Sequence, residues 1–324
     1  MSSNVTNGKA FEYACLRAIY DKVNGNVKIL TSKQLTTAEE SFSSIESNEK
    51  GFLVQAASTG AKILSNLEPK LVYGDGILEL SIAADAIAVG SDGDVRDVFC
   101  VRRYDGKDGW TIGISCKHNH EALRHPRITE GKDFGKDWLN IPCSKAFIEE
   151  ITPITDSLVS FGKNNAQWNT IPNKLDDYYV PILSAYIREI ERLCSAHPET
   201  PELLLRYFFG ANDFYKVIMH SKSRTTTLIA FNMNGTLNKP ADKHKAMTKI
   251  PVMTMPSRLF NAEFKQTNKG PSKTTIILTF DNGWAVSMRL HNKDKIAKPT
   301  SLAWDVKLEG IPPSAYTNTH SWDE

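Results

Sequence analysis

The spacing of apolar residues at the start of the chain predicts two amphipathic helices. Residues 8–23 place apolar side chains every three to four positions, and Glu12 lies elsewhere on the helical wheel. Residues 52–67 repeat this spacing, and the Glu68-Pro69 step ends it because the residue before a proline disfavours the helical conformation. Residues 31–49 are rich in serine, threonine and glutamate, which predicts a loop with room for a short helix.

Three apolar runs follow, and turn-forming residues separate them. The runs cover 78–89, 95–102 and 110–116, with turns over 91–94 and 104–109. Short runs of this length, joined by short turns, are typical of neighbouring antiparallel strands. We therefore expect a three-stranded meander in this part of the chain.

The remaining pattern changes from helical to strand spacing. Helical spacing covers 143–161 and 176–196 within a middle region of about 120–211, and alternation with a period of two begins after His220. The strands expected from this alternation are 225–231, 274–280 and 284–290, the last behind the hairpin turn Asp281-Asn282-Gly283. The sequence thus predicts an α/β (α+β) protein.

Length and composition are those of a globular protein with two domains. The chain has 324 residues, of which 41% are hydrophobic and 23% are charged, and domains commonly hold about 150 residues. We place the boundary after residue 211. Residues 1–211 are then an α/β core with the helical middle region, and residues 212–324 are a basic, mainly β lobe.

The chain carries no sign of a membrane span, a secretion signal or a disulfide framework. Its N-terminus lacks an apolar signal region, and no window approaches the roughly 18 consecutive apolar residues of a spanning helix. The five cysteines are scattered and form no C-x-x-C pair, which argues against both a disulfide scaffold and a zinc ribbon. We expect a cytoplasmic protein.

The formal charge of +2 is unevenly distributed. Residues 213–298 hold 15 Lys and Arg against 5 Asp and Glu, a local balance of +10, so the rest of the chain carries −8. A basic block mixed with Asn, Thr and aromatic residues is typical of a surface that binds a polyanion, and contact with a nucleic-acid backbone is its commonest use. A solvated basic face is the structural alternative.

Two charged residues fall on the predicted meander. Asp85 lies within the apolar run that ends at Val89, and Lys117 directly follows the run that ends at Cys116. Charges in apolar surroundings are costly unless they are paired or bound to a metal. A carboxylate and an ammonium on neighbouring strands suit metal-assisted phosphodiester cleavage, in which Mg²⁺ activates water and neutralises charge on the phosphate.

In this interpretation Asp85 anchors the Mg²⁺, the backbone carbonyl of Cys116 is a second ligand, and Lys117 orients water or binds the developing oxyanion. A single side-chain carboxylate is a small number of charged ligands for Mg²⁺, so we expect Glu12 or Glu68 to complete the site. An edge-strand aspartate, a first-turn glutamate and a solvated helix end are the structural alternatives for the three carboxylates.

The signatures Ala84-Asp85 and Ser115-Cys116-Lys117 resemble those of the PD-(D/E)xK nuclease fold, in which a helix and two strands form the active site. Two departures accompany this resemblance. Ala84 stands where the family has proline, which matters little. Ser115 occupies the catalytic position where the family has its second carboxylate, and this departure weakens the metal site. The missing carboxylate ligand is then expected from Glu12 or Glu68.

Three longer strings extend the resemblance to both ends of the chain: residues 112–127 (IGISCKHNHEALRHPR), 8–15 (GKAFEYAC) and 280–292 (FDNGWAVSMRLHN). They resemble the HaeIII-type restriction endonuclease family. The resemblance implies a Mg²⁺-dependent type II enzyme that cuts double-stranded DNA at the palindrome GGCC, leaving 5′-phosphate and 3′-hydroxyl ends. A palindromic site favours a homodimer, and a restriction enzyme implies a DNA methyltransferase of the same specificity that protects the host.

DNA contacts are expected from two groups of polar residues. The first group follows Lys117, is assigned to phosphates beside the scissile bond, and has a solvated helix start as its alternative: Asn119, His120, Arg124 and Arg127. The second lies in the basic block and holds the arginines that could each read a guanine through O6 and N7: Arg224, Arg258 and Arg289. His291 shares the polar strand face of Ser287 and Arg289, so we also expect it to face DNA.

Two other functions fit the same residues. A structure-selective nuclease on this fold, of the junction-resolvase or repair type, would cut without regard to GGCC. A non-catalytic DNA-binding module would use Asp85 and Lys117 as a buried ion pair, and in that case Asp85→Ala would damage folding rather than leave a folded, inactive protein.

Overall fold

The structure is a computed structural model that describes residues 3–23, 25–83, 94–105, 107–119, 123–128 and 133–322. The chain forms two compact units that alternate along the sequence. Unit 1 contains Met1–Glu121, Asn212–Thr254 and Ser314–Glu324. Unit 2 contains Ala122–Ala211 and Met255–Pro313.

The helices of unit 1 come from the start of the chain: α1 (Ser3–Lys22), α2 (Lys33–Ser44), α3 (Ser47–Leu67) and α4 (Pro69–Tyr73). The predicted helices at 8–23 and 52–67 are confirmed, and α3 ends at Leu67, directly before Glu68. The region expected to be mostly loop instead holds the twelve-residue helix α2. Ser32 explains its start, because the Ser32 side chain accepts a hydrogen bond from the Leu35 amide at 3.1 Å and caps the first turn.

Unit 1 contains a mixed sheet whose described strands follow the order β1-β2-β3-β4-β5-β6-β11. The strands are β1 (Val27–Ile29), β2 (Ile77–Ile82), β3 (Val98–Tyr104), β4 (Lys107–His118), β5 (Phe214–His220), β6 (Thr225–Phe231) and β11 (Thr317–Ser321). The pairs β1–β2 and β4–β5 are parallel and the other pairs are antiparallel. The predicted meander is therefore present as β2-β3-β4, although residues 84–89 of its first run lie outside the described residues.

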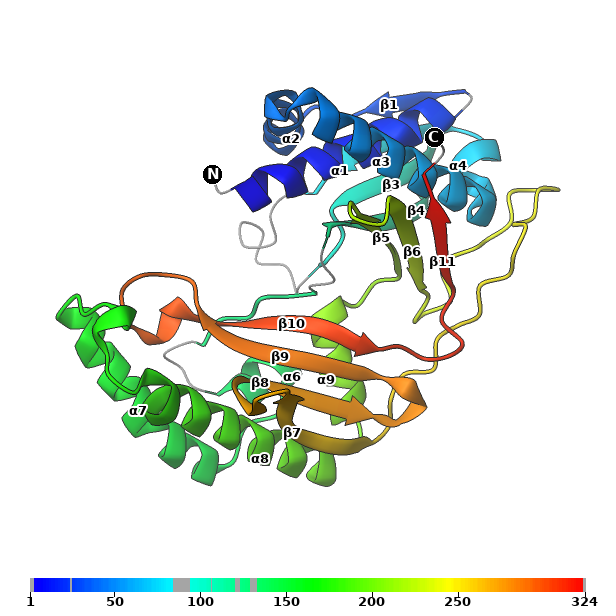
Figure 1. The fold of residues 1–324 in the computed structure, drawn as a ribbon. Coiled ribbons are helices and arrows are strands. Elements are labelled where there is room, and N and C mark those ends of the chain that lie inside the picture. Colours follow the sequence, from blue (N-terminus) through cyan, green and yellow to red (C-terminus); the bar gives the residue numbers. More distant parts are fainter. Residues whose placement is uncertain are drawn as a thin grey trace. The chain divides into compact units, whose positions relative to one another are not determined.

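Helices α1 and α3 pack on one face of this sheet (Figure 1). Phe11 and Leu16 of α1 and Leu64 of α3 are fully buried among side chains of the sheet. Strand β5 was not predicted, because Phe214–Met219 are all buried and so show no alternation. Continuous burial is expected of a strand that lies in the middle of a mixed sheet beside a parallel neighbour.

Unit 2 combines the helical middle of the chain with an antiparallel sheet. Its α-helices are α6 (Phe134–Leu139), α7 (Lys145–Lys163), α8 (Val180–Ala196) and α9 (Thr200–Phe209), and its strands are β7 (Leu259–Thr267), β8 (Gly270–Phe280), β9 (Ala285–Asn292) and β10 (Leu302–Gly310). The strand order is β10-β9-β8-β7, and α8 packs on β7 and β8 (Figure 1). The predicted turn at Asp281–Gly283 joins β8 to β9, with Asn282 and Gly283 at φ angles of 57° and 85°.

The mixed α/β class is confirmed, but one boundary after residue 211 does not describe the division of the chain. The chain does pass from unit 2 to unit 1 at that point, yet it crosses again after Thr254 and after Pro313. Strands β5, β6 and β11 belong to the sheet of unit 1, and the helical middle shares unit 2 with β7–β10. Nothing in local spacing encodes which strands far apart in sequence pair with each other. Over the described ranges, no helix is long and apolar enough to span a membrane.

Candidate active site

A carboxylate that precedes β3 lies beside the end of β4. The Asp97 amide donates to the carbonyl of Ile114 on β4 at 2.8 Å, and the Asp97 carbonyl accepts from the Ala83 amide at 2.9 Å. These two hydrogen bonds extend the ladders that hold β3 between β2 and β4. The backbone of Asp97 is therefore fixed by both neighbouring segments.

The Asp97 side chain binds three successive residues of β4 through one oxygen. Asp97 Oδ2 accepts from the Cys116 amide at 2.7 Å, from Lys117 Nζ at 3.3 Å and from Ser115 Oγ at 3.3 Å. Lys117 Nζ and Asp97 also form an ion pair in which both side chains are mostly buried. All hydrogen bonds found for this carboxylate within the described residues involve Oδ2, which leaves Oδ1 as the oxygen that can bind a cation.

Glu12 of α1 adds a second carboxylate to this cluster. Its side chain is buried and accepts a hydrogen bond from Lys9 Nζ at 3.0 Å. Burial and, to a smaller extent, the negative charge of Asp97 raise the pKa of Glu12 to about 7, against the opposing effect of the charges of Lys9 and Lys117. The negative charges of the two carboxylates repel each other, and a cation bound between or beside them would reduce this repulsion.

Strand alternation explains why Ser115 and Lys117 share this site and the Cys116 side chain does not. The Cys116 thiol is buried in the core on the α1 side and is hydrogen-bonded with Cys15, an interaction that raises the pKa of Cys116 together with burial. Ser115 and Lys117 occupy the alternate positions of β4, and both side chains contact Asp97. Cys116 reaches Asp97 through its backbone amide, and the predicted role of its carbonyl as a metal ligand stays a prediction.

Sequence reasoning missed Asp97 and named Asp85 instead. Asp85 lies outside the described residues, so its predicted role stays untested. Asp97 is inside the run 95–102 that was predicted to be a strand, and its signal was its position: an acidic residue at the start of a strand that pairs with the strand of Lys117. Gly113 contributes as well, because a Cβ there would lie 2.0 Å from Cδ of Arg96, the residue that precedes Asp97 and crosses β4.

Glu68 belongs to a different environment. Glu68 Oε1 accepts from the Tyr215 hydroxyl at 2.7 Å and from the Asn238 amide at 2.6 Å, while Oε2 is buried without a hydrogen-bond partner among the described residues. Burial raises the pKa of Glu68 to about 7. These contacts hold the segment that follows β6, and none of them joins Glu68 to Asp97 or Lys117, so Glu12 is the glutamate that the structure brings to the cluster.

The sequence as a whole matches a known family. The model of the HaeIII restriction endonuclease family covers residues 8–312 of this chain. The chain belongs to this family. The type II restriction enzyme HaeIII of Haemophilus aegyptius is 35% identical to it over 321 residues, which cover 98% of each chain. No solved structure matches the chain.

Family membership confirms the predicted enzyme class, a type II site-specific deoxyribonuclease. Type II restriction endonucleases generally use a divalent metal ion and act on double-stranded DNA. In this HaeIII-family endonuclease, Glu12, Asp97 and Lys117 bring two carboxylates and one ammonium group together, and we name these three residues the acidic cluster.

The residues that follow Lys117 in this family member are mostly bound to the protein itself. His120 lies outside the described residues. Asn119 Oδ1 accepts from the Ser221 amide at 2.7 Å and Nδ2 donates to Ser221 Oγ at 2.8 Å, so Asn119 secures the β5–β6 turn. Arg124 donates to the Tyr207 carbonyl at 2.9 Å and lies over its ring, and Arg127 donates to the Thr300 carbonyl at 3.0 Å. Their predicted phosphate contacts remain predictions.

The predicted guanine-reading arginines of this endonuclease lie in both units, because the basic block 213–298 is divided after Thr254. Arg224 of unit 1 has its guanidinium over the Phe52 ring, and Arg258 of unit 2 has its guanidinium over Phe260. Arg289 on β9 forms an ion pair with Asp305 on β10.

The predicted alternation of β9 is confirmed for Arg289, which is exposed between the buried residues Met288 and Leu290, whereas Ser287 is buried. His291 is half-buried, and its Nε2 has no hydrogen-bond partner among the described residues.

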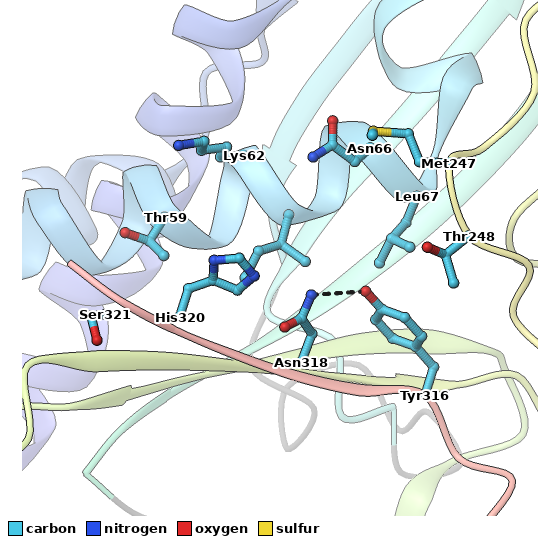
Figure 2. Close-up of a pocket in the computed structure, with 11 residues that line it drawn as sticks. Thr59, Lys62, Asn66, Leu67, Met247, Thr248, Tyr316, Asn318, His320 and Ser321 are labelled. Carbon is cyan, nitrogen blue, oxygen red and sulfur yellow. Dashed lines mark hydrogen bonds between the residues drawn. The ribbon is translucent and has the colours of Figure 1, made fainter. Parts of the chain in front are cut away.

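A pocket of about 220 Å³ in unit 1 is not part of this cluster (Figure 2). It lies between α3, β11 and the segment around Met247. Lys62, Asn318 and His320 give it a polar lining, and Asn318 Nδ2 donates to the Tyr316 hydroxyl at 3.0 Å (Figure 2). Glu12, Asp97 and Lys117 do not line it, so the reaction on DNA is not assigned to this pocket.

Proposed function

We propose that this protein cleaves double-stranded DNA at the acidic cluster, in a reaction that depends on Mg²⁺. The observation that carries the proposal is the binding of Asp97 Oδ2 by the Cys116 amide and Lys117 Nζ, which puts a carboxylate and an ammonium at adjoining strand ends. Phosphodiester hydrolysis needs these two kinds of group, one to hold a metal ion and the other to stabilise negative charge.

The donor set fits a hard cation. Asp97 Oδ1 and the Glu12 carboxylate are oxygen ligands, and the backbone carbonyl of Cys116 is the third candidate. Within the part of the chain that the structure describes, no group of three His, Cys, Asp or Glu side chains converges. Mg²⁺ tolerates such a site, because it commonly binds one or two carboxylates and retains several waters. Asp85 stays a candidate for a further ligand.

The residues of the cluster have separate roles in this proposal. Mg²⁺, when bound, would lower the pKa of water and neutralise charge on the scissile phosphate. Lys117 Nζ pairs with Asp97 and stabilises negative charge that develops on oxygen. Ser115 Oγ and the Cys116 amide fix Asp97 through Oδ2, so that Oδ1 keeps one direction. Glu12 would supply the second carboxylate that holds the cation, and the cation would favour the ionised form of this buried carboxyl.

The finer features follow from the resemblance to the family. We propose the palindrome GGCC as the recognised sequence and ends that carry 5′-phosphate and 3′-hydroxyl groups. A homodimer would present one cluster to each strand of a palindrome. We also propose a cytoplasmic enzyme whose host carries a methyltransferase of the same specificity.

Digestion of plasmid DNA tests the proposal. The purified protein is incubated with plasmid in Mg²⁺ and in EDTA, and the fragment ends are sequenced. We expect fragments that end within GGCC in Mg²⁺ alone, with Asp97→Asn inactive. Fragments at another fixed sequence would remove the GGCC assignment, and fragments without fixed ends would favour a structure-selective nuclease. Full activity of Asp97→Asn together with loss of activity in Asp85→Asn would move the site to Asp85.

A further inference from the structure

The sheet of unit 2 has one apolar face and one polar face. Met288 and Leu290 of β9 and Trp304 and Val306 of β10 are buried, and α8 packs on the neighbouring strands β7 and β8. The alternate residues of β9 and β10 point to the other side. On that side the side chains of Arg289 and Lys307 are 54% and 47% exposed. We call it the polar face of unit 2.

A buried carboxylate lies in this polar face. Asp305 is directly opposite Arg289 in the β9–β10 register and is only 6% exposed. Its Oδ2 lies 3.1 Å from Arg289 Nη2 and 4.0 Å from Lys307 Nζ, and its Oδ1 lies 3.5 Å from His125 Nδ1. Asp305 is therefore surrounded by basic side chains from two strands and from the segment before α6.

This contact limits the freedom of the Arg289 side chain. Arginine has five N–H donors in a rigid plane, and a contact at Nη2 leaves most of them available. Because the carboxylate is buried and fixed in the sheet, it orients the guanidinium plane while the exposed half of the side chain faces solvent. An oriented guanidinium loses little conformational entropy when it binds.

The charge balance around Asp305 favours an electron-rich partner. Arg289 and Lys307 carry two positive charges against the single negative charge of Asp305, and His125 adds another when protonated. Guanine presents two acceptors, O6 and N7, in the major groove, and arginine that donates to both is the commonest specific base contact. Strand β9 lies between β8 and β10 in this sheet, so Arg289 presents its guanidinium to a partner from the face of the sheet.

The other candidate arginines are held differently. The guanidinium groups of Arg224 and Arg258 lie over aromatic rings, and Arg124 and Arg127 donate to backbone carbonyls of unit 2. Arg127 also pairs with Asp294 at 3.7 Å, but that carboxylate is exposed, unlike Asp305. These four arginines lie on loops. Their contacts do not hold the planar N–H donors of a guanidinium outward from a rigid sheet, as the contact of Arg289 does. Arg289 combines a rigid strand, a buried orienting carboxylate and exposure.

We infer that Arg289 reads a guanine of the recognised sequence and that Asp305 is the positioning residue for Arg289. The inference rests on the proposed function, because it needs a duplex substrate with guanine in the recognised site. It goes beyond that function by assigning sequence specificity to the polar face of unit 2, through one arginine and one carboxylate.

The experiment is a binding selection from duplexes with a randomised central segment. The full-length protein carries Lys117→Ala so that bound DNA is not cut, and the retained duplexes are sequenced. Two variants are compared in this background: Arg289→Lys, which keeps the charge and removes the planar fork, and Asp305→Asn, which keeps the shape and removes the charge. The matched control variants are Arg188→Lys and Glu150→Gln, which alter an exposed Arg–Glu pair in the same unit.

We expect Arg289→Lys to lower the preference for guanine about 10- to 100-fold at one position of each half-site and to leave the other positions unchanged. Asp305→Asn should lower the preference at the same position by a smaller factor, with an unchanged thermal unfolding temperature. A merely structural role of Asp305 would not change base preference at one position. The control variants should retain the parent preference throughout.

Three outcomes would overturn the inference: unchanged base preferences in both variants, a uniform loss of affinity for all duplexes, or a parent protein that selects no sequence. The plasmid digestion of the preceding section separates these from failure of the proposed function. A parent that selects and cuts a sequence other than GGCC would refute the proposed specificity, and the Arg289 assignment would still be decided at each guanine of that sequence.

Discussion

Asp97 in unit 1 and Asp305 in unit 2 both form an ion pair with a basic side chain, yet the charges that surround the two pairs differ in sign. Beside Asp97 lies a second carboxylate, Glu12, whose pKa is raised to about 7. Beside Asp305 lie further basic groups, Lys307 and His125. A site rich in carboxylates attracts a cation, whereas a carboxylate outnumbered by basic groups orients them toward acceptors. One type of ion pair thus supports two functions.

The largest effect that tests this comparison is expected at Asp97. Asp97→Asn keeps the size of the side chain but removes the charge that would bind the metal and pair with Lys117. We expect cleavage to fall by about 10³-fold, the size of loss seen when a group that stabilises transition-state charge is removed. Single-turnover cleavage rates measure it, with circular dichroism to show that the variant is folded.

Asp94→Asn is the control for this measurement. Asp94 lies three residues before Asp97, and its carboxylate binds Arg96 instead of Lys117. We expect its cleavage rate to stay within a few-fold of the parent rate. Equal losses in Asp94→Asn and Asp97→Asn would show that this segment acts through folding alone, and the assignment of Asp97 to the site would be withdrawn.

Glu68 sharpens the comparison because it is a buried carboxylate whose hydrogen-bond donors, Tyr215 and Asn238, are neutral. The unfolded chain releases this proton near pH 4.5, whereas burial raises the folded pKa to about 7. The folded protein therefore binds more protons between these values, and stability falls as pH rises through this window. The change is at most about 3.5 kcal/mol, from a shift of about 2.5 pKa units at about 1.4 kcal/mol per unit.

Glu68→Gln cannot titrate, so its free energy of unfolding should gain up to about 3.5 kcal/mol relative to the parent between pH 4.5 and 7.5. Chemical denaturation at a series of pH values measures this difference. The control is Glu79→Gln, because pairing with Arg103 and Lys28 lowers the pKa of Glu79 and places its titration below the window. A Glu68→Gln profile parallel to that of the parent would contradict the raised pKa.

Much of the fold could be predicted from local patterns, since α1, α3 and the β2-β3-β4 meander each have a distinct apolar period. Strand β5 has no such period because it is buried on both faces. Its pairing with β4 depends on residues about one hundred positions apart. Long-range pairing also determines which unit a strand joins, and local spacing does not contain that information.

The residues of the site also differ in whether local sequence patterns predict them. Lys117 and Glu12 could be found because each lies on an element that the apolar pattern identifies. Asp97 could not be chosen over other acidic residues, because its importance comes from the register that brings the start of β3 to the end of β4. Asp305 was missed for the same reason, since only the β9–β10 register places it opposite Arg289.

A smaller effect is expected at Asn119, which links the end of β4 to the β5–β6 turn. Asn119 has a φ of 58°, so Asn119→Gly removes the two contacts to Ser221 without straining the backbone. We expect a loss of about 1 kcal/mol in the free energy of unfolding, because these hydrogen bonds are exposed to solvent. Denaturant titration measures the loss. Asn119→Ala should be less stable than Asn119→Gly, and the reverse order would contradict the role of the positive φ.

The smallest effect concerns an ion pair without a buried partner. Arg188 on α8 and Glu150 on α7 are both exposed, whereas Arg289 is bound to a buried carboxylate. A double-mutant cycle with alanine at positions 188 and 150 should give a coupling energy below about 0.5 kcal/mol, since solvent screens exposed pairs. The cycle at Arg289 and Asp305 should give about 1 kcal/mol, because Asp305 cannot regain full hydration when Arg289 is removed. Equal coupling energies in the two cycles would mean that burial of Asp305 adds nothing to the contact, and Asp305 would then lack the rigidity that its positioning role requires.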